Sequence, residues 1–213
     1  MNAFRKAGLL IIVLVVPVLV FLFLKLFGTN HFDLPYYFPL TDPRTGEVSK
    51  AGEDTLYYRV SNFTLQTVDG QAIDEKSLNG KVIVAHTTSG CDEGTCQKVL
   101  AQVQRVSTLA STIDNLRVLT ILPAEVDSST QQIMTGYKAQ GWLVQNEDEM
   151  SAERIFKLNE SPSTNQTIPL TSRLVLIDPQ GYIRGYYDAL NPEDVDRLMV
   201  EIKILDYGSS LPK

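Results

Sequence analysis

The longest hydrophobic run of the chain lies near its N-terminus. Residues 8–24 are seventeen consecutive positions without a charged or polar side chain. At about 1.5 Å per residue, a helix of this length nearly spans the hydrocarbon core of a bilayer. No small-residue cleavage site follows the run, which favours a retained anchor over a cleaved signal peptide. We therefore predict that residues 1–28 form a cytoplasmic stub and a single transmembrane helix.

The charges that flank this run predict its orientation. Arg5 and Lys6 precede it, and basic residues favour the cytoplasmic side of a membrane. We expect a single-pass protein of the cytoplasmic membrane, with its N-terminus inside. The C-terminal domain would then lie on the periplasmic or extracytoplasmic side.

Residues 29–54 show neither the period of two that is typical of a strand nor the 3.6-residue period of a helix. The segment is rich in proline, glycine and aromatic residues, as an irregular juxtamembrane stalk would be. Aromatic rings are not expected in a free linker. Tyr36, Tyr37 and Phe38 therefore indicate a stalk that is draped over the following domain.

From residue 55 to residue 213, strand-like and helix-like patterns alternate. The expected elements are a hairpin turning at Asp69-Gly70, a strand at 81–86, a helix carrying Val99, Val103, Val106 and Ala110, a strand at 116–122, a helix capped by Asp127, a short helix from Ser151, strands at 173–178 and 182–187, and a helix capped by Asn191. This order predicts an α/β fold of the thioredoxin-like type, a mixed sheet flanked by helices.

Charge narrows the range of partners. Residues 1–27 contain three basic residues and no acidic one, so the remaining chain holds 16 basic and 25 acidic residues, a net charge of −9. A surface of this sign repels the phosphate backbone of nucleic acids. We therefore expect no nucleic-acid partner, and the membrane is the first partner that the sequence indicates.

The only thiols of the chain, Cys91 and Cys96, lie between the strand at 81–86 and the helix that follows it. The free N–H groups at a helix start favour a thiolate over a thiol. Two cysteines can form one disulfide, which an exterior location permits. Within one helix, residues five apart would lie about 8–9 Å from each other, too far for a disulfide. Cys91 should therefore lie in a loop that folds back, where Gly90 and Gly94 give the backbone freedom.

Two acidic residues stand between the cysteines. Asp92 and Glu93 oppose thiolate formation by their like charge. The chain also leaves open that Cys91 and Cys96 form only a static, structural bridge.

Several segments of the chain resemble the SCO/SenC family of membrane-anchored copper chaperones. The resemblance rests on residues 30–35, 63–65, 78–81, 119–127 and 171–187, the last of which is similar to the final hairpin of the family almost residue for residue. It implies a thioredoxin-like fold and a role in the assembly of cytochrome c oxidase, so an oxidase subunit or another copper-site protein is the implied partner.

The resemblance also implies a copper site made of two cysteines and one histidine. Carried over to this chain, Cys91 and Cys96 would be the copper ligands, whereas Leu170 occupies the position of the family histidine. Thiolates select copper(I), and an imidazole helps to hold copper(II). The two histidines of the chain, His31 in the stalk and His86 in the strand, are expected to be structural. A third ligand would have to come from Met134, Met150 or an acidic residue.

Three functions therefore stay open. The first is a copper-handling assembly factor with a weakened two-thiolate site. The second is a thiol–disulfide oxidoreductase, with Cys91 as the attacking thiol and Cys96 as the resolving thiol. The third is a chemically inert binding domain of the thioredoxin fold.

Overall fold

The computed structural model describes residues 13–23, 34–123, 141–145, 151–160 and 167–210. The chain divides into two compact units, Met1–Asp33 and Leu34–Lys213. In the first unit, residues 13–23 are helical. Among the described residues, no helix combines the length and the apolar character that a membrane crossing needs. The predicted anchor at residues 8–24 extends beyond the described helix at both ends, and it stays a prediction.

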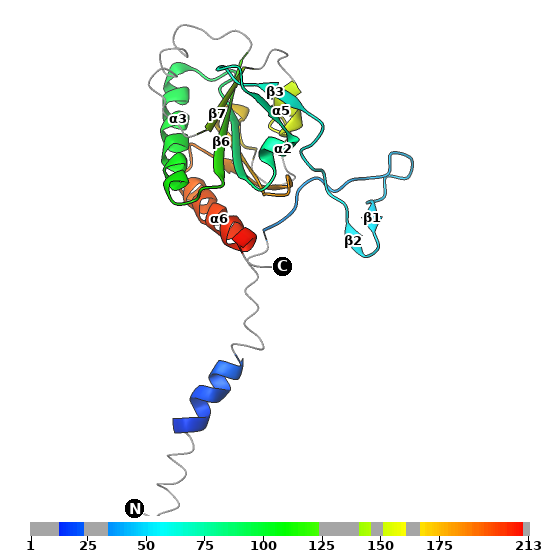
Figure 1. The fold of residues 1–213 in the computed structure, drawn as a ribbon, viewed down its shortest axis with the longest axis vertical. Coiled ribbons are helices and arrows are strands. Elements are labelled where there is room, and N and C mark those ends of the chain that lie inside the picture. Colours follow the sequence, from blue (N-terminus) through cyan, green and yellow to red (C-terminus); the bar gives the residue numbers. More distant parts are fainter. Residues whose placement is uncertain (1–12, 24–33, 124–140, 146–150, 161–166, 211–213) are drawn as a thin grey trace, which may run out of the picture. The chain divides into compact units, whose positions relative to one another are not determined.

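The second unit is built on a five-stranded mixed sheet with the strand order β7-β6-β5-β8-β9 (Figure 1). The strands are β5 (Val82–Thr87), β6 (Leu116–Leu122), β7 (Gly141–Gln145), β8 (Arg173–Ile177) and β9 (Ile183–Asp188). The first three of these strands run parallel, and β8 and β9 pair antiparallel. The predicted thioredoxin-like mixed sheet is confirmed.

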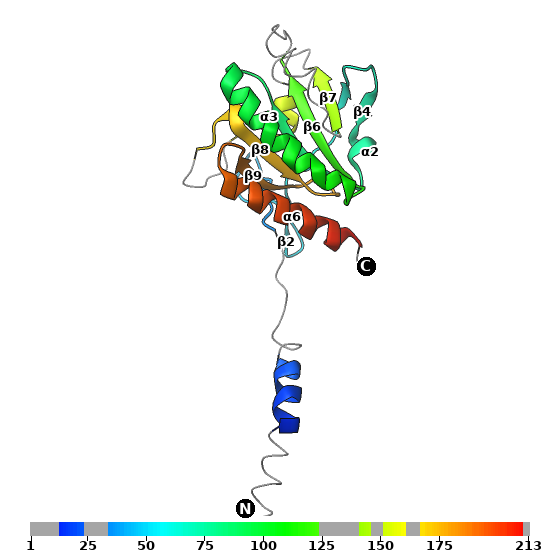
Figure 2. The same ribbon diagram turned by 90° about the vertical axis from the view of Figure 1, so that its left-hand side faces the viewer.

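Two long helices cover one face of this sheet. Helix α3 (Glu93–Ser107) and helix α6 (Pro192–Ser210) lie against the same face in both views (Figures 1 and 2). Their apolar sides meet the sheet in a cluster that includes Val99 and Val103 of α3 and Leu198 and Ile202 of α6. Short 3-10 helices extend α3 (Thr108–Ser111) and precede β8 (Leu170–Ser172).

The opposite face of the sheet is covered by smaller elements. They are the hairpin of β3 (Thr64–Gln66) and β4 (Ala72–Asp74), helix α2 (Glu75–Leu78) and helix α5 (Ser151–Ile155). Phe63 and Phe156 from this layer join a second buried cluster with β5 residues Ile83 and Ala85. Because both faces are covered, the central strands are apolar on both sides, as is typical of buried parallel strands.

Most predicted elements are confirmed within two residues of the predicted bounds, including the hairpin at Asp69-Gly70 and the C-terminal helix. Four short elements were not predicted: helix α2, strand β7, and the two strands of a ribbon, β1 (Lys50–Ala51) and β2 (Asp54–Thr55). The predicted helix from Asp127 lies outside the described residues.

The start of the second unit is fastened to the sheet by Arg184 of β9. The guanidinium of Arg184 forms a buried ion pair of 2.8 Å with Asp178. It also donates hydrogen bonds to the carbonyl oxygens of Leu34 and Pro35, and it lies 3.7 Å from the ring centre of Tyr36. The draping predicted from the aromatic residues is confirmed for this part of the segment, and the β1–β2 ribbon projects beyond it (Figure 1).

Replacing Arg184 by alanine should destabilise the fold strongly. Asp178, which is 1% exposed, would lose its charge partner, and breaking a buried pair in this way typically costs about 3–5 kcal/mol. We expect urea unfolding of the full chain, followed by circular dichroism, to show a loss of about 3 kcal/mol or more.

The matched control is Arg105→Ala. Arg105 pairs with Asp196 at the surface, where both side chains are well exposed, and such pairs contribute at most about 1 kcal/mol. Equal losses for the two variants would contradict the fastening role of Arg184.

Candidate functional site

The two cysteines form a disulfide at the start of α3. Strand β5 ends at Thr87, Asp92 is the N-cap of α3, and the helix begins at Glu93. Cys91 therefore lies in the loop, whereas Cys96 lies in the first turn of the helix. Their Cα atoms are 5.6 Å apart and their sulfurs are bonded. The prediction that Cys91 precedes the helix in a loop that folds back is confirmed.

The two sulfurs differ in their access to solvent. Cys96 is 2% exposed, and Cys91 is partly exposed. The Sγ atom of Cys91 lies 3.2 Å from the carbonyl oxygen of Thr88, an acceptor to which a reduced Cys91 thiol can donate. Cys91 is thus the more exposed of the two cysteines, and it is the one that the sequence predicts as the attacking thiol of an oxidoreductase.

Asp92 has a role that the sequence analysis missed. Its carboxylate accepts hydrogen bonds from the backbone N–H of Thr95 at 3.0 Å and from the Thr95 hydroxyl at 2.7 Å. These hydrogen bonds, led by that of the Thr95 side chain, lower the pKa of Asp92. An aspartate directly before an amphipathic helix is a common N-cap. Asp92 therefore fixes the first turn that carries Cys96, in addition to placing a negative charge beside the sulfurs.

His86 is a buried residue of the sheet, as predicted. It is 0% exposed, and its Nε2 atom lies 2.8 Å from the hydroxyl oxygen of Thr120 on β6. Burial lowers the pKa of His86 to about 4, because an apolar environment disfavours the charged imidazolium. The ring is therefore neutral at physiological pH.

The three-ligand copper site implied by the resemblance does not fit the described residues. Leu170, at the family histidine position, packs against the buried cluster under α5 and offers no lone pair. In the described part of the chain, no group of three or more histidine, cysteine, aspartate or glutamate residues is placed to hold a metal ion. His31, Met134 and Met150 lie outside the described residues. What the structure does bring together is the sulfur pair alone.

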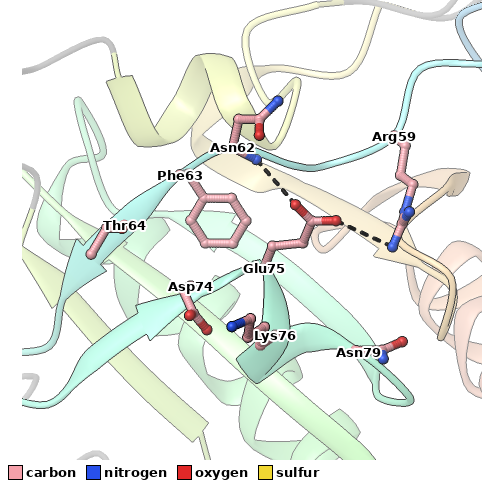
Figure 3. A pocket seen from close by; sticks show the side chains of 8 residues that line it. All are labelled: Arg59, Asn62, Phe63, Thr64, Asp74, Glu75, Lys76 and Asn79. Carbon is pink, nitrogen blue, oxygen red and sulfur yellow. Dashed lines mark hydrogen bonds and ion pairs between the residues drawn. The ribbon is translucent and has the colours of Figure 1, made fainter.

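A surface pocket of about 400 Å³ lies apart from the cysteines, between the β3–β4 hairpin and α2. Figure 3 shows Glu75 at its centre, with one carboxylate oxygen 3.3 Å from a guanidinium nitrogen of Arg59 and the other 3.3 Å from the backbone nitrogen of Asn62. The carboxylate of Asp74 caps α2 through Ser77. The charged groups of this pocket thus support the local fold, and none of the predicted site residues lines it.

No protein-family model matches the chain, and no curated protein matches it. Several solved structures do. BsSco, a member of the Sco family of cytochrome c oxidase assembly proteins, is 17% identical with a TM-score of 0.56, over 70% of this chain and 94% of that protein. A SCO1/SenC family lipoprotein from Bacillus anthracis is 17% identical with a TM-score of 0.50, over 67% of this chain and 92% of its own.

A third similar structure is described in other terms than the two Sco proteins. A proposed protein disulfide isomerase from Bacteroides thetaiotaomicron is 19% identical with a TM-score of 0.53, over 82% of this chain and 94% of that one. At these identities the comparisons establish the fold alone: the second unit has a thioredoxin-like fold. Its structural neighbours include the family that the sequence resembles and a protein described in terms of disulfide chemistry.

The buried His86 should make the stability of the protein depend on pH. Between pH 6.5 and 4, the unfolded chain binds a proton at this histidine that the folded chain does not bind, so stability falls as the pH falls through this range. The full effect is about 3 kcal/mol. We expect urea unfolding of the full chain at pH 7, 5.5 and 4 to show this fall. His86→Gln should show a clearly smaller one, and parallel curves for the two proteins would refute the assignment.

Proposed function

We propose that this chain is an SCO-like, membrane-anchored protein that exchanges disulfides with a partner protein outside the cytoplasmic membrane. The observation that carries the proposal is the bond between a partly exposed cysteine, Cys91, and a buried cysteine, Cys96, at the start of α3. An accessible sulfur beside a protected one suits an attacking thiol and a resolving thiol.

The exchange needs no group other than a partner disulfide. In the reduced chain, the Cys91 thiolate attacks one partner sulfur, the partner disulfide breaks, and a mixed disulfide forms. Cys96 then loses its proton and attacks the sulfur of Cys91, which restores the bond seen in the structure. The second partner thiolate leaves and takes up a proton. The partner gains two electrons and two protons, and an external dithiol returns them to Cys91 and Cys96.

Two features of the chain support the proposed location. The apolar run at residues 8–24, preceded by Arg5 and Lys6, supports an anchor with the domain outside. Disulfides persist in oxidising compartments and are rare in the cytosol, so the Cys91–Cys96 bond suits the same side of the membrane. Maintaining the thiols of a cytochrome c oxidase subunit or another copper-site protein is the role that we propose there.

Copper(I) binding is a second candidate function, because the sequence resembles the SCO/SenC family of copper chaperones and the fold is similar to two Sco structures. Copper would be the cargo that the protein delivers. Once reduced, Cys91 and Cys96 present two soft thiolates, which select copper(I). Without a histidine at position 170, we expect copper(II) to be held weakly.

Disulfide exchange can be tested with insulin as the model partner. The full chain in detergent, with dithiothreitol as the electron donor, should reduce insulin disulfides at least several-fold faster than dithiothreitol alone. Cys91→Ser should lose this activity, because the attacking sulfur is gone. Cys96→Ser should instead accumulate a mixed disulfide that mass spectrometry detects.

Copper binding is tested on the same protein after reduction. Anaerobic titration against a copper(I) chelator should give one copper(I) per chain, and Cys91→Ser should abolish tight binding. If the chain neither reduces insulin nor retains copper(I), both candidates fail and the inert binding domain stands.

A further inference from the structure

A buried carboxylate lies at the end of β5, on the opposite side of the sheet from α3. Glu153 of α5 is 5% exposed, and its Oε1 atom accepts a hydrogen bond of 3.0 Å from the hydroxyl of Thr87. Thr87 is the last residue of β5, so the carboxylate is held at the point where the chain leaves the sheet for the cysteine loop.

The contact of Glu153 continues into the cysteine loop. The hydroxyl oxygen of Thr87 lies 3.0 Å from the hydroxyl oxygen of Ser89 and accepts a hydrogen bond of 3.1 Å from the Ser89 backbone N–H. Ser89 is two residues from Cys91, separated only by Gly90, whose φ angle is +71°. The chain Glu153–Thr87–Ser89 therefore joins a buried carboxyl group to the cysteine loop.

No neighbouring cation neutralises Glu153 in the part of the chain that the structure describes. The other titratable groups on the elements around it are bound elsewhere or face solvent. Arg154 is exposed, and Lys157 pairs with Glu160. The remaining groups donate to backbone carbonyls: Arg173 to those of Leu158, Glu160 and Ile168, Tyr58 to that of Ile155, and Tyr186 to that of Lys157. His86 is neutral, and strand alternation places it on the other face of β5.

We infer that Glu153 is a positioning residue that sets the redox equilibrium of the Cys91–Cys96 pair. It acts through Thr87 and Ser89 on the cysteine loop. A negative charge that is linked to the cysteine loop through these hydroxyls disfavours a thiolate in the reduced form, so it favours the disulfide. This inference rests on the proposed function, because it concerns the same sulfur pair.

The test is the equilibrium of the pair with glutathione. Two molecules of glutathione reduce the disulfide to two thiols and leave as one glutathione disulfide, so the fraction reduced gives an equilibrium constant. Glu153→Gln keeps an oxygen that can accept the Thr87 hydroxyl but removes the charge. We expect this variant of the full chain to shift the equilibrium constant at least threefold toward the dithiol.

Two further variants make the result decisive. Glu160→Gln removes a charge from the same segment, but its carboxylate is 44% exposed and pairs with Lys157, so the wild-type equilibrium should be retained. Thr87→Val breaks the hydrogen bond that holds Glu153 beside the loop and should shift the equilibrium in the same direction as Glu153→Gln. It also provides the test if Glu153→Gln does not fold.

The outcomes separate this inference from the proposed function. An unchanged equilibrium in the folded Glu153→Gln variant, or an equal shift in Glu160→Gln, overturns the inference even if the wild-type protein reduces insulin. A shift confined to Glu153→Gln and Thr87→Val supports it even if insulin is not reduced, since glutathione needs no docking surface.

Discussion

The position of the sulfur pair depends on the pairing of one central strand. Strand β5 is bonded to β6 on one edge and to β8 on the other, and all six of its residues are buried. Such a strand can neither slide in register nor tilt without exposing apolar side chains on both faces. The point at which the chain leaves the sheet is therefore fixed. Helix α3, whose Val99 and Val103 pack on the same sheet, fixes the other end of the cysteine loop.

The side chains of β5 change from apolar to polar near the C-terminal end of the strand. Val82 to Ala85 are apolar, whereas His86 and Thr87 are polar and equally buried. Each polar side chain has a partner on its own side of the sheet, Thr120 for His86 and Glu153 for Thr87. A buried polar group without such a partner would destabilise the fold. The end of β5 thus tolerates polar groups next to a reactive pair because the adjacent strand β6 and helix α5 supply those partners.

The sequence predicts those parts of the fold that rest on local patterns. The apolar run of β6, the spacing of Val99, Val103 and Val106, and the cap of the last helix at Asn191 are all local, and the structure agrees with each. Helix α2 has only four residues, so it offers no period to detect. Strand β7 begins at Gly141 and pairs with β6 across a long separation in sequence, which no local pattern reveals.

In the candidate site, too, only the features that depend on local sequence were predicted. The loop position of Cys91 followed from helix geometry, and the burial of His86 followed from the strand pattern. Glu153 could not be predicted, because it reaches Thr87 across 66 residues of sequence. The position of Asp92 before an amphipathic helix indicates a helix cap, but only the effect of its charge on the thiolates was predicted. The missing histidine ligand at Leu170 was recognised only through the resemblance to the SCO/SenC family, because a leucine by itself does not indicate a metal site.

Arg184 determines how the second unit responds to mechanical load. Its guanidinium holds the carbonyls of Leu34 and Pro35 while it is paired to Asp178 inside the sheet domain. Tension applied through the preceding residues is therefore transmitted to β9 at residue 34, before it reaches the β1–β2 ribbon. The ribbon follows these residues along the chain, so it lies outside the path of that force.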